Sequence, residues 1–198
     1  MKSFATETSR VEAFSDGVFA VIITIMVLEL RPPAGTELRS LLEMLPAIAT
    51  YALSFVFIGI YWNNHHHMLR ASRGVDGRAM WANLNLLFWL SLVPFSTAWL
   101  GRNPLANGPT AFYATIFLLD AVAYTLLVRA LLAVNGKNAP FAKAIASDVK
   151  GNVSIVLYVL AVAASFVAPI ATDVLLVAVA VTWLVPDRRF EPLINLEQ

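Results

Sequence analysis

The chain has 198 residues, of which 59% are hydrophobic and 14% are charged, and its mean hydropathy is +0.70. Soluble domains carry about 45–50% apolar and about 25% charged residues, so this composition excludes an ordinary soluble domain and indicates an integral membrane protein. The 14 basic and 13 acidic residues nearly cancel and give no support for nucleic acid binding, while the absence of cysteine excludes disulfides and thiolate sites.

Six apolar segments have about the length of a membrane-spanning helix, for which roughly 17–25 residues are needed. They are predicted at about 13–30, 45–67, 81–100, 110–134, 153–168 and 170–185. Barrel strands are disfavoured, because their segments would be about ten residues long with alternating polarity. The chain is therefore predicted to be one all-α membrane domain over residues 1–198, embedded in a lipid bilayer, with no soluble domain and no metal or other cofactor.

The first predicted helix carries a charge inside its apolar run, at Asp16, next to Ser15. It is not expected to be a cleaved signal peptide, because no small-residue cleavage site follows. A charge within a span costs roughly 2.5–3.5 kcal/mol and marks a functional site by default. Asp16 and Arg10, two turns earlier, are interpreted either as interfacial charges or as groups that bind neighbouring helices.

The second predicted helix ends in three adjacent histidines, His65, His66 and His67. Neighbouring side chains on a helix point about 100° apart, whereas a helical metal pair needs i, i+4 spacing. A zinc site is therefore disfavoured. We expect one or more of these histidines to bond to Asp16 or Ser15, because a neutral imidazole offsets the cost of a buried carboxylate.

The third predicted helix begins with Asn83 and Asn85 at the same depth as the histidines, and Pro94 predicts a kink in its outer half. A polar cluster is expected where the first three helices meet. Its candidate members are Arg10, Ser15, Asp16, one or more of His65, His66 and His67, and Asn83 or Asn85.

The fourth predicted helix carries Asp120 near its middle, as either a hydrogen-bonded or a protonated carboxyl group. The last two helices are short and are predicted to form a hairpin that turns at Pro169 and Asp173. One unbroken crossing is excluded, because about 30 apolar residues is too long.

The basic residues predict the orientation, since cytoplasmic loops are enriched in lysine and arginine. With six crossings, 11 of the 14 lie on the side that holds both termini. They are Lys2, Arg10, Arg70, Arg73, Arg78, Arg129, Lys137, Lys143, Lys150, Arg188 and Arg189. Both termini are therefore expected in the cytoplasm.

The segment Arg10-x-x-x-Phe14-Ser15-Asp16-Gly17 resembles the first helix of the transmembrane protein 175 potassium channel family. Trp62-Asn-Asn-His65-His66-His67, Asn83-Leu-Asn85 and Pro94-Phe95 are similar to later parts of that family, so the resemblance covers essentially the whole chain. It implies a potassium-permeable cation channel, rather than an enzyme, in the plasma (inner) membrane of a prokaryote. It also implies a homotetramer of six-helix units whose first helices surround one pore, without a carbonyl-lined filter.

The resemblance also implies roles for particular residues. Val21, Ile25 and Leu28 would form apolar rings that narrow and gate the pore, and Thr24 would contribute to ion selectivity. Arg10, Phe14, Ser15, Asp16, His66, His67, Asn83 and Asn85 would anchor the pore helix. Family members more often have Ile or Leu at the position of Val21. Valine is shorter by one methylene, so each subunit has one methylene fewer at this position.

Helical periodicity independently places the four pore positions and Gly17 on one face. We call Gly17, Val21, Thr24, Ile25 and Leu28, at spacings of 4, 3, 1 and 3, the first-helix stripe. Apolar rings can gate a pore by dewetting. The same pattern is also typical of a helix face buried in packing. Glu29, just beyond the stripe, is either a cation-attracting group at the outer mouth or an ordinary interface charge.

Three other functions are compatible with the sequence. A small oligomeric cation or proton-coupled transporter would use Asp16, Asp120 and the histidines as relay groups. It is disfavoured because no two-half symmetry is visible. An intramembrane enzyme is disfavoured because the nucleophile motifs and metal-ligand spacings of known enzymes are missing. The third alternative is a structural scaffold.

Overall fold

The structure is a computed structural model that describes residues 2–72, 74–136 and 149–184, and the side chains within them except those of residues 2–7 and 149. The described residues form helices joined by short connections, with no strand. The helices are α1 (Lys2–Leu28), α2 (Leu38–Leu42), α3 (Leu45–Ala71), α4 (Gly77–Leu90), α5 (Val93–Arg102), α6 (Asn107–Asn135), α8 (Val149–Ala164) and α9 (Pro169–Leu184). The fold is therefore all-α, as predicted.

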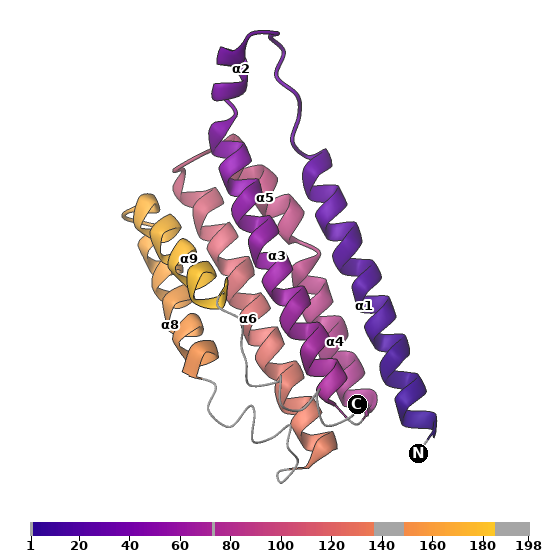
Figure 1. The fold of residues 1–198 in the computed structure, drawn as a ribbon. Coiled ribbons are helices and arrows are strands. Elements are labelled where there is room, and N and C mark those ends of the chain that lie inside the picture. The colour runs from indigo at the N-terminus through magenta and orange to yellow at the C-terminus, as the bar shows by residue number, and fades with distance from the viewer. Residues whose placement is uncertain (1, 73, 137–148, 185–198) are drawn as a thin grey trace.

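Four segments are long and apolar enough to cross a membrane: 8–28, 45–71, 77–102 and 107–135. The last two predicted helices are present as α8 and α9, which lie side by side in Figure 1. Each has 16 residues and so spans about 24 Å, less than the roughly 30 Å of a bilayer core. Asp173, predicted in the turn between them, lies inside α9 instead, because the helix already begins at Pro169.

The third predicted helix is two helices. α4 ends at Leu90 and α5 begins at Val93, with Pro94 in its first turn. Proline lacks a backbone N–H and is tolerated in the first turn of a helix, so the expected kink is a break between two helices. The short helix α2 was not predicted, and prolines at 32 and 33 separate it from α1.

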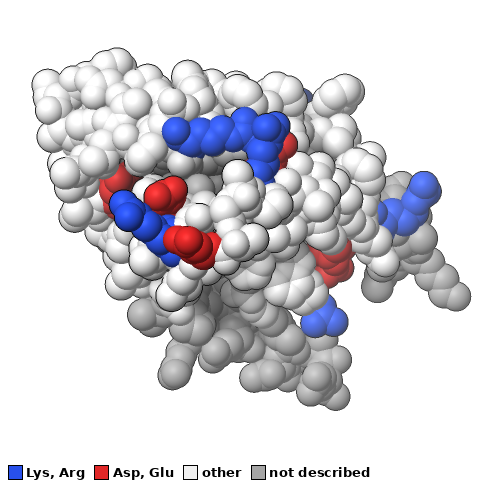
Figure 2. Space-filling view, turned by 90° about the horizontal axis from the view of Figure 1, so that it is seen from above, with Lys and Arg blue, Asp and Glu red and all other residues white. Residues whose placement is uncertain are grey.

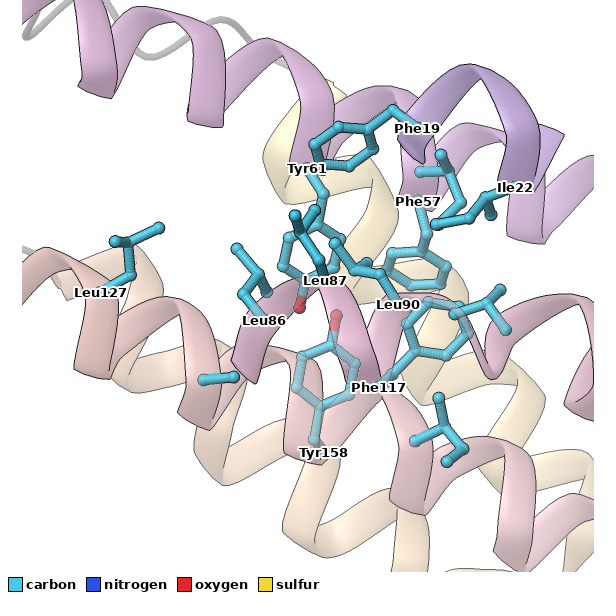
Figure 3. Packing of buried hydrophobic residues seen from close by; sticks show 14 of the residues in the cluster. Phe19, Ile22, Phe57, Tyr61, Leu86, Leu87, Leu90, Phe117, Leu127 and Tyr158 are labelled. Atoms are coloured by element: carbon cyan, nitrogen blue, oxygen red, sulfur yellow. The ribbon is translucent and has the colours of Figure 1, made fainter. Parts of the chain in front are cut away.

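A core of large apolar side chains fills the space between α3, α4, α6, α8 and α9. Figure 3 shows Phe57, Phe117 and Tyr158 gathered in it; the Phe57 and Phe117 rings lie 4.3 Å apart. At the α2 end, Gly101 lets α5 approach α3 closely, because a Cβ atom there would lie 3.0 Å from the Cα of Ala47.

α1 lies at the edge of the bundle, beside α3, α4 and α5 (Figure 1). Its buried side chains are Thr8, Ser15, Phe19, Ile22 and Met26, and the last four recur at helical spacing. Only this face is therefore covered by the rest of the subunit, and the opposite face of α1 remains open.

Candidate functional site: the exposed face and anchors of α1

The first-helix stripe lies on the open face of α1. The exposed fractions of its large apolar side chains are 54% for Val21, 44% for Ile25 and 79% for Leu28. Gly17 and Thr24 are exposed as well. The alternative that this stripe is a packing face inside the subunit is therefore wrong, although a partner subunit, lipid or a pore can still cover it.

Thr24 is the polar member of the stripe. Its hydroxyl donates a hydrogen bond of 2.9 Å to the carbonyl oxygen of Val21, one turn earlier. A hydroxyl has one hydrogen to donate and two acceptor lone pairs. Because the hydrogen is used within the helix, the lone pairs of Thr24 are available to a cation.

An apolar groove of about 960 Å³ runs between α1 and α5. Phe14, Val21 and Ile25 line it from α1, and Pro94 and Phe95 line it from α5. The groove thus adjoins the stripe and gives the open side of α1 a concave apolar surface.

The buried face of α1 is held by a chain of hydrogen bonds through three helices. His65 Nε2 of α3 donates to Asn83 Oδ1 of α4 over 2.7 Å, and Asn83 Nδ2 donates to Ser15 Oγ over 3.0 Å. Ser15 Oγ donates in turn to the carbonyl oxygen of Val11, at 2.8 Å. All three hydrogen bonds run in one direction, from His65 toward Val11. Neutral His65 with its hydrogen on Nε2 is sufficient to donate the first of them.

Two further contacts form a ladder between α1 and α3. The indole Nε1 of Trp62 donates a 2.9 Å hydrogen bond to Asp16 Oδ1, and His66 Nδ1 lies 2.8 Å from Glu12 Oε1. The histidines were expected to bond to Asp16 or Ser15; Asp16 instead accepts from Trp62, and His65 reaches Ser15 through Asn83. Glu12 and Asp16 are four residues apart, as are Trp62 and His66, so each pair lies on one face of its helix.

The other predicted members of the cluster take different positions. Arg10 is exposed, and it has no hydrogen bond or ion pair within the described part of the chain. Phe14 is exposed, and Asn85 is half-buried without a hydrogen bond to a described residue. The ring of His67 packs edge-on against His66 at 5.6 Å. The structure thus brings Ser15, His65 and Asn83 together, and leaves Arg10 and Asn85 outside.

Glu12 and Trp62 are site residues that the sequence reasoning missed. The sequence did contain a signal for them: Glu12 and Asp16 are four residues apart on one predicted helix, and Trp62 and His66 are four apart on the next. Such spacing places each pair on one face, where the two faces can meet. Trp62 was named only for its place in the family resemblance, and its N–H donor was left out of account.

The α2 end of the molecule carries paired charges, shown as adjacent blue and red side chains in Figure 2. Arg102 Nη2 at the end of α5 donates to Glu29 Oε2 just beyond α1, over 2.8 Å. Arg39 and Glu43 form a looser pair at 3.9 Å. The carboxylate of Glu29 is therefore partly neutralised within its own subunit.

The fold and these contacts define a multi-pass helical membrane protein in which one edge helix is anchored by polar contacts and open on its apolar face. Residues 10–94 match the family model described as "Endosomal/lysosomal potassium channel TMEM175". The chain is 47% identical over 182 residues to a protein of Chryseobacterium sp. that is named a potassium channel, covering 92% of this chain and 95% of that one. A potassium channel of Streptomyces collinus is 37% identical over 129 residues, 63% of each chain.

A solved structure gives the same result. The crystal structure of a lysosomal potassium-selective channel TMEM175 homolog from Chamaesiphon minutus superimposes with a TM-score of 0.80 at 30% identity, covering 92% of this chain and 98% of that one. The chain belongs to the TMEM175 potassium channel family. This confirms the resemblance stated from the sequence, and the family is one of ion channels rather than enzymes.

Proposed function

We propose that this chain is a potassium-permeable cation channel, in which K⁺ moves passively through a pore lined by α1 of four identical subunits. The observation that carries the proposal is the exposure of the first-helix stripe on the side of α1 that its own subunit leaves open. Relatives named potassium channels support the choice of ion. One α1 cannot enclose a pore, and a closed cyclic assembly is the common way to surround an axis with identical helices.

In this proposal Val21, Ile25 and Leu28 form successive apolar rings and Thr24 supplies the hydroxyl oxygens between them. An apolar constriction passes ions only when it is hydrated, so these rings act as the gate. Oxygen lone pairs replace part of the hydration shell of an ion, so Thr24 acts on selectivity. The hydrogen bond from Thr24 to the Val21 carbonyl supports this role, because it leaves the hydroxyl as an acceptor.

The buried polar contacts have an architectural role in this proposal. Ser15, Asn83 and His65, together with Asp16 and Trp62, fix the rotation of α1 and thereby the direction in which the stripe faces. We further propose that the assembly lies in the plasma (inner) membrane of a prokaryote with both termini in the cytoplasm. The α2 end and Glu29 then lie at the outer mouth.

The transporter alternative receives no support from the positions of its relay groups. Asp16 lies on the side of α1 that faces α3, where it accepts a hydrogen bond from Trp62. Asp120 lies on α6 and interacts electrostatically with Tyr61 and Tyr158 inside the subunit. The two carboxyl groups belong to separate clusters rather than to one relay.

Recording the purified protein in planar bilayers tests the function, with K⁺ on one side and Na⁺ on the other. We expect single-channel events and a reversal potential displaced toward that of K⁺, and we expect chemical crosslinking to give a tetramer. Stoichiometric uptake coupled to a second ion, without unitary currents, would refute the channel in favour of a transporter. A monomer that conducts would refute the shared pore.

A further inference from the structure

Two neighbouring hollows meet at the α2 end of the molecule. One is the apolar groove of about 960 Å³ between α1 and α5. The other, which we call the α2-end cavity, has a volume of about 460 Å³ and lies between the end of α1, the start of α3 and the end of α5. Glu29, Ala98 and Arg102 line both hollows, so the groove and the cavity adjoin at these residues.

The two hollows differ in polarity. Among the residues that line the groove, only Glu29 and Arg102 are charged, and both lie at its α2 end. The wall of the α2-end cavity adds the charged side chains of Arg31 and Glu43 and the hydroxyl group of Tyr51. Together the hollows are polar at one end and apolar along the rest, which is the pattern of an amphiphilic ligand. Both volumes lie within the range of roughly 300–1,000 Å³ that is typical of ligand pockets.

One guanidinium group in the cavity wall has no partner. Arg102 forms its ion pair with Glu29, and Arg39, outside the cavity, lies 3.9 Å from Glu43. Arg31 makes no ion pair or hydrogen bond with any residue that the structure describes. A guanidinium group binds a phosphate through two parallel hydrogen bonds. Basic pockets between membrane helices are also known places for phospholipid headgroups.

The rest of the cavity wall suits a headgroup that carries both signs of charge. The hydroxyl of Tyr51 has no hydrogen bond to another described residue and can donate to a phosphate. The two carboxylate and two guanidinium groups of the wall balance, which favours a zwitterion over an anion. The carboxylate of Glu43 is 72% exposed and only loosely paired, so it is available to an ammonium group.

We propose that the α2-end cavity and the groove bind one phospholipid from the leaflet at the α2 end, with a zwitterionic headgroup that carries a primary ammonium group. Arg31 and Tyr51 bind the phosphate, and Glu43 binds the ammonium group. An acyl chain passes Ala98 and lies in the groove, against Phe95.

The alternative occupants satisfy only half of this surface. A helix of a second copy would cover the groove but leave Arg31 and Tyr51 without partners, and a free phosphate ion would leave the groove empty. The lipid is compatible with the proposed pore. The groove includes Val21 and Ile25 but not Thr24 or Leu28, so it lies on the flank of the first-helix stripe that faces α5.

Native mass spectrometry of the full-length protein, purified from vesicles of phosphatidylethanolamine, tests the headgroup. We expect one retained lipid per subunit, lost in Arg31→Gln. Arg39→Gln is the matched control, because Arg39 lies at the same end but outside the cavity wall, and it should keep the lipid. Vesicles of phosphatidylglycerol, which lacks the ammonium group, should give less retention. Equal retention of the two lipids, or retention that survives Arg31→Gln, overturns the proposal.

A larger side chain at the junction tests the acyl chain. Ala98→Phe should abolish retention, and Ala178→Phe, at an exposed position on α9, should not. Phosphatidylethanolamine added to lipid-depleted protein should raise the thermal midpoint of the unmodified protein and of Ala178→Phe, but not of Ala98→Phe, with circular dichroism showing that each variant is folded.

The alternatives have their own outcomes in the same experiments. Inorganic phosphate that raises the midpoint as much as the lipid overturns the proposal in favour of an ion site. Loss of oligomers in Ala98→Phe with the lipid still retained assigns the groove to a second copy. Because every readout is binding rather than current, failure of the lipid site is distinguishable from failure of the proposed channel.

Discussion

The indole N–H of Trp62 on α3 donates to the carboxylate of Asp16 on α1, over 2.9 Å. One helical turn along the same interface, His66 meets Glu12. The two contacts show that α1 and α3 run antiparallel here. Together they fix the position of α1 along α3 and its rotation about its own axis. Because the first-helix stripe is on the opposite side of α1, these contacts determine where the stripe points.

Replacing Trp62 by Phe keeps an aromatic ring and removes the donor to Asp16. We expect fewer tetramers or a changed open probability, and an unchanged reversal potential between K⁺ and Na⁺, because the pore-facing atoms are untouched. Asp16→Ala should have the same effect. Gel filtration and bilayer recording measure both quantities. Trp81→Phe, at an exposed position on α4, is the matched control. Normal tetramers with unchanged open probability in both variants would contradict the anchoring role.

Replacing Asn83 by Ala interrupts the chain from His65 to Ser15. Both partners are buried, so the loss of their hydrogen bonds should cost about 1–3 kcal/mol in the free energy of unfolding. A lower thermal midpoint of the purified protein measures this change. Asn152→Ala, at an exposed position on α8, should leave the midpoint unchanged. Equal midpoints for the two variants would show that the chain contributes nothing to stability.

Enlarging Val21 to Trp should block the current. In a tetramer the substitution adds four indole rings at one height of the first-helix stripe, and a dry constriction of this kind excludes hydrated ions. Val27→Trp is the matched control, because Val27 is exposed on a different face of α1. Unitary currents should persist in that variant. Currents of normal size in Val21→Trp would remove this residue from the pore wall.

Thr24→Ala should weaken the preference for K⁺ over Na⁺, whereas Thr24→Ser should keep it. Serine retains the hydroxyl that bonds to the Val21 carbonyl, and alanine replaces it with an apolar surface. The reversal potential under bi-ionic conditions measures the preference. Equal reversal potentials for the alanine variant and the unmodified channel would assign selectivity to another position.

Arg102→Gln should raise the conductance for cations at low ionic strength. Glu29 then loses the guanidinium 2.8 Å away and exposes an uncompensated charge at the proposed outer mouth. The increase should disappear at high salt, where screening shortens the range of the charge. The double variant with Glu29→Gln is the control and should return toward the original value. An increase that persists in the double variant would place its origin elsewhere.

The lengths of the apolar runs were sufficient to predict the long helices. The predicted segment 45–67 overlaps α3, and 110–134 overlaps α6, because unbroken apolar runs of that length have few alternatives in a bilayer. The break at residues 91–92 was predicted only as a kink, since the sequence shows the proline but not how two halves of a span pack. The α2 helix is too short for any periodicity to identify it.

The site was harder to predict than the fold. The sequence placed Ser15, Asn83 and the histidines at one depth, which is a matter of counting residues along helices. Which histidine meets Asn83 depends on the rotation of α3 about its axis, and packing of the whole core sets that rotation. For the same reason the sequence left Asp16 and Ser15 as alternative partners of the histidines and did not identify Trp62 as the partner of Asp16.

The interruption between α4 and α5 has a mechanical consequence. Asn83 secures one end of α1 from α4, and Arg102 holds the other end from α5. Backbone bonds from Ser91 to Leu87 and from Leu92 to Trp89 cross the junction, but the regular i to i−4 series is interrupted there. We therefore expect α4 and α5 to bend against each other more easily than two halves of one continuous helix. The two ends of α1 are thus held by two separate helices, and a change at one of them need not reach the other.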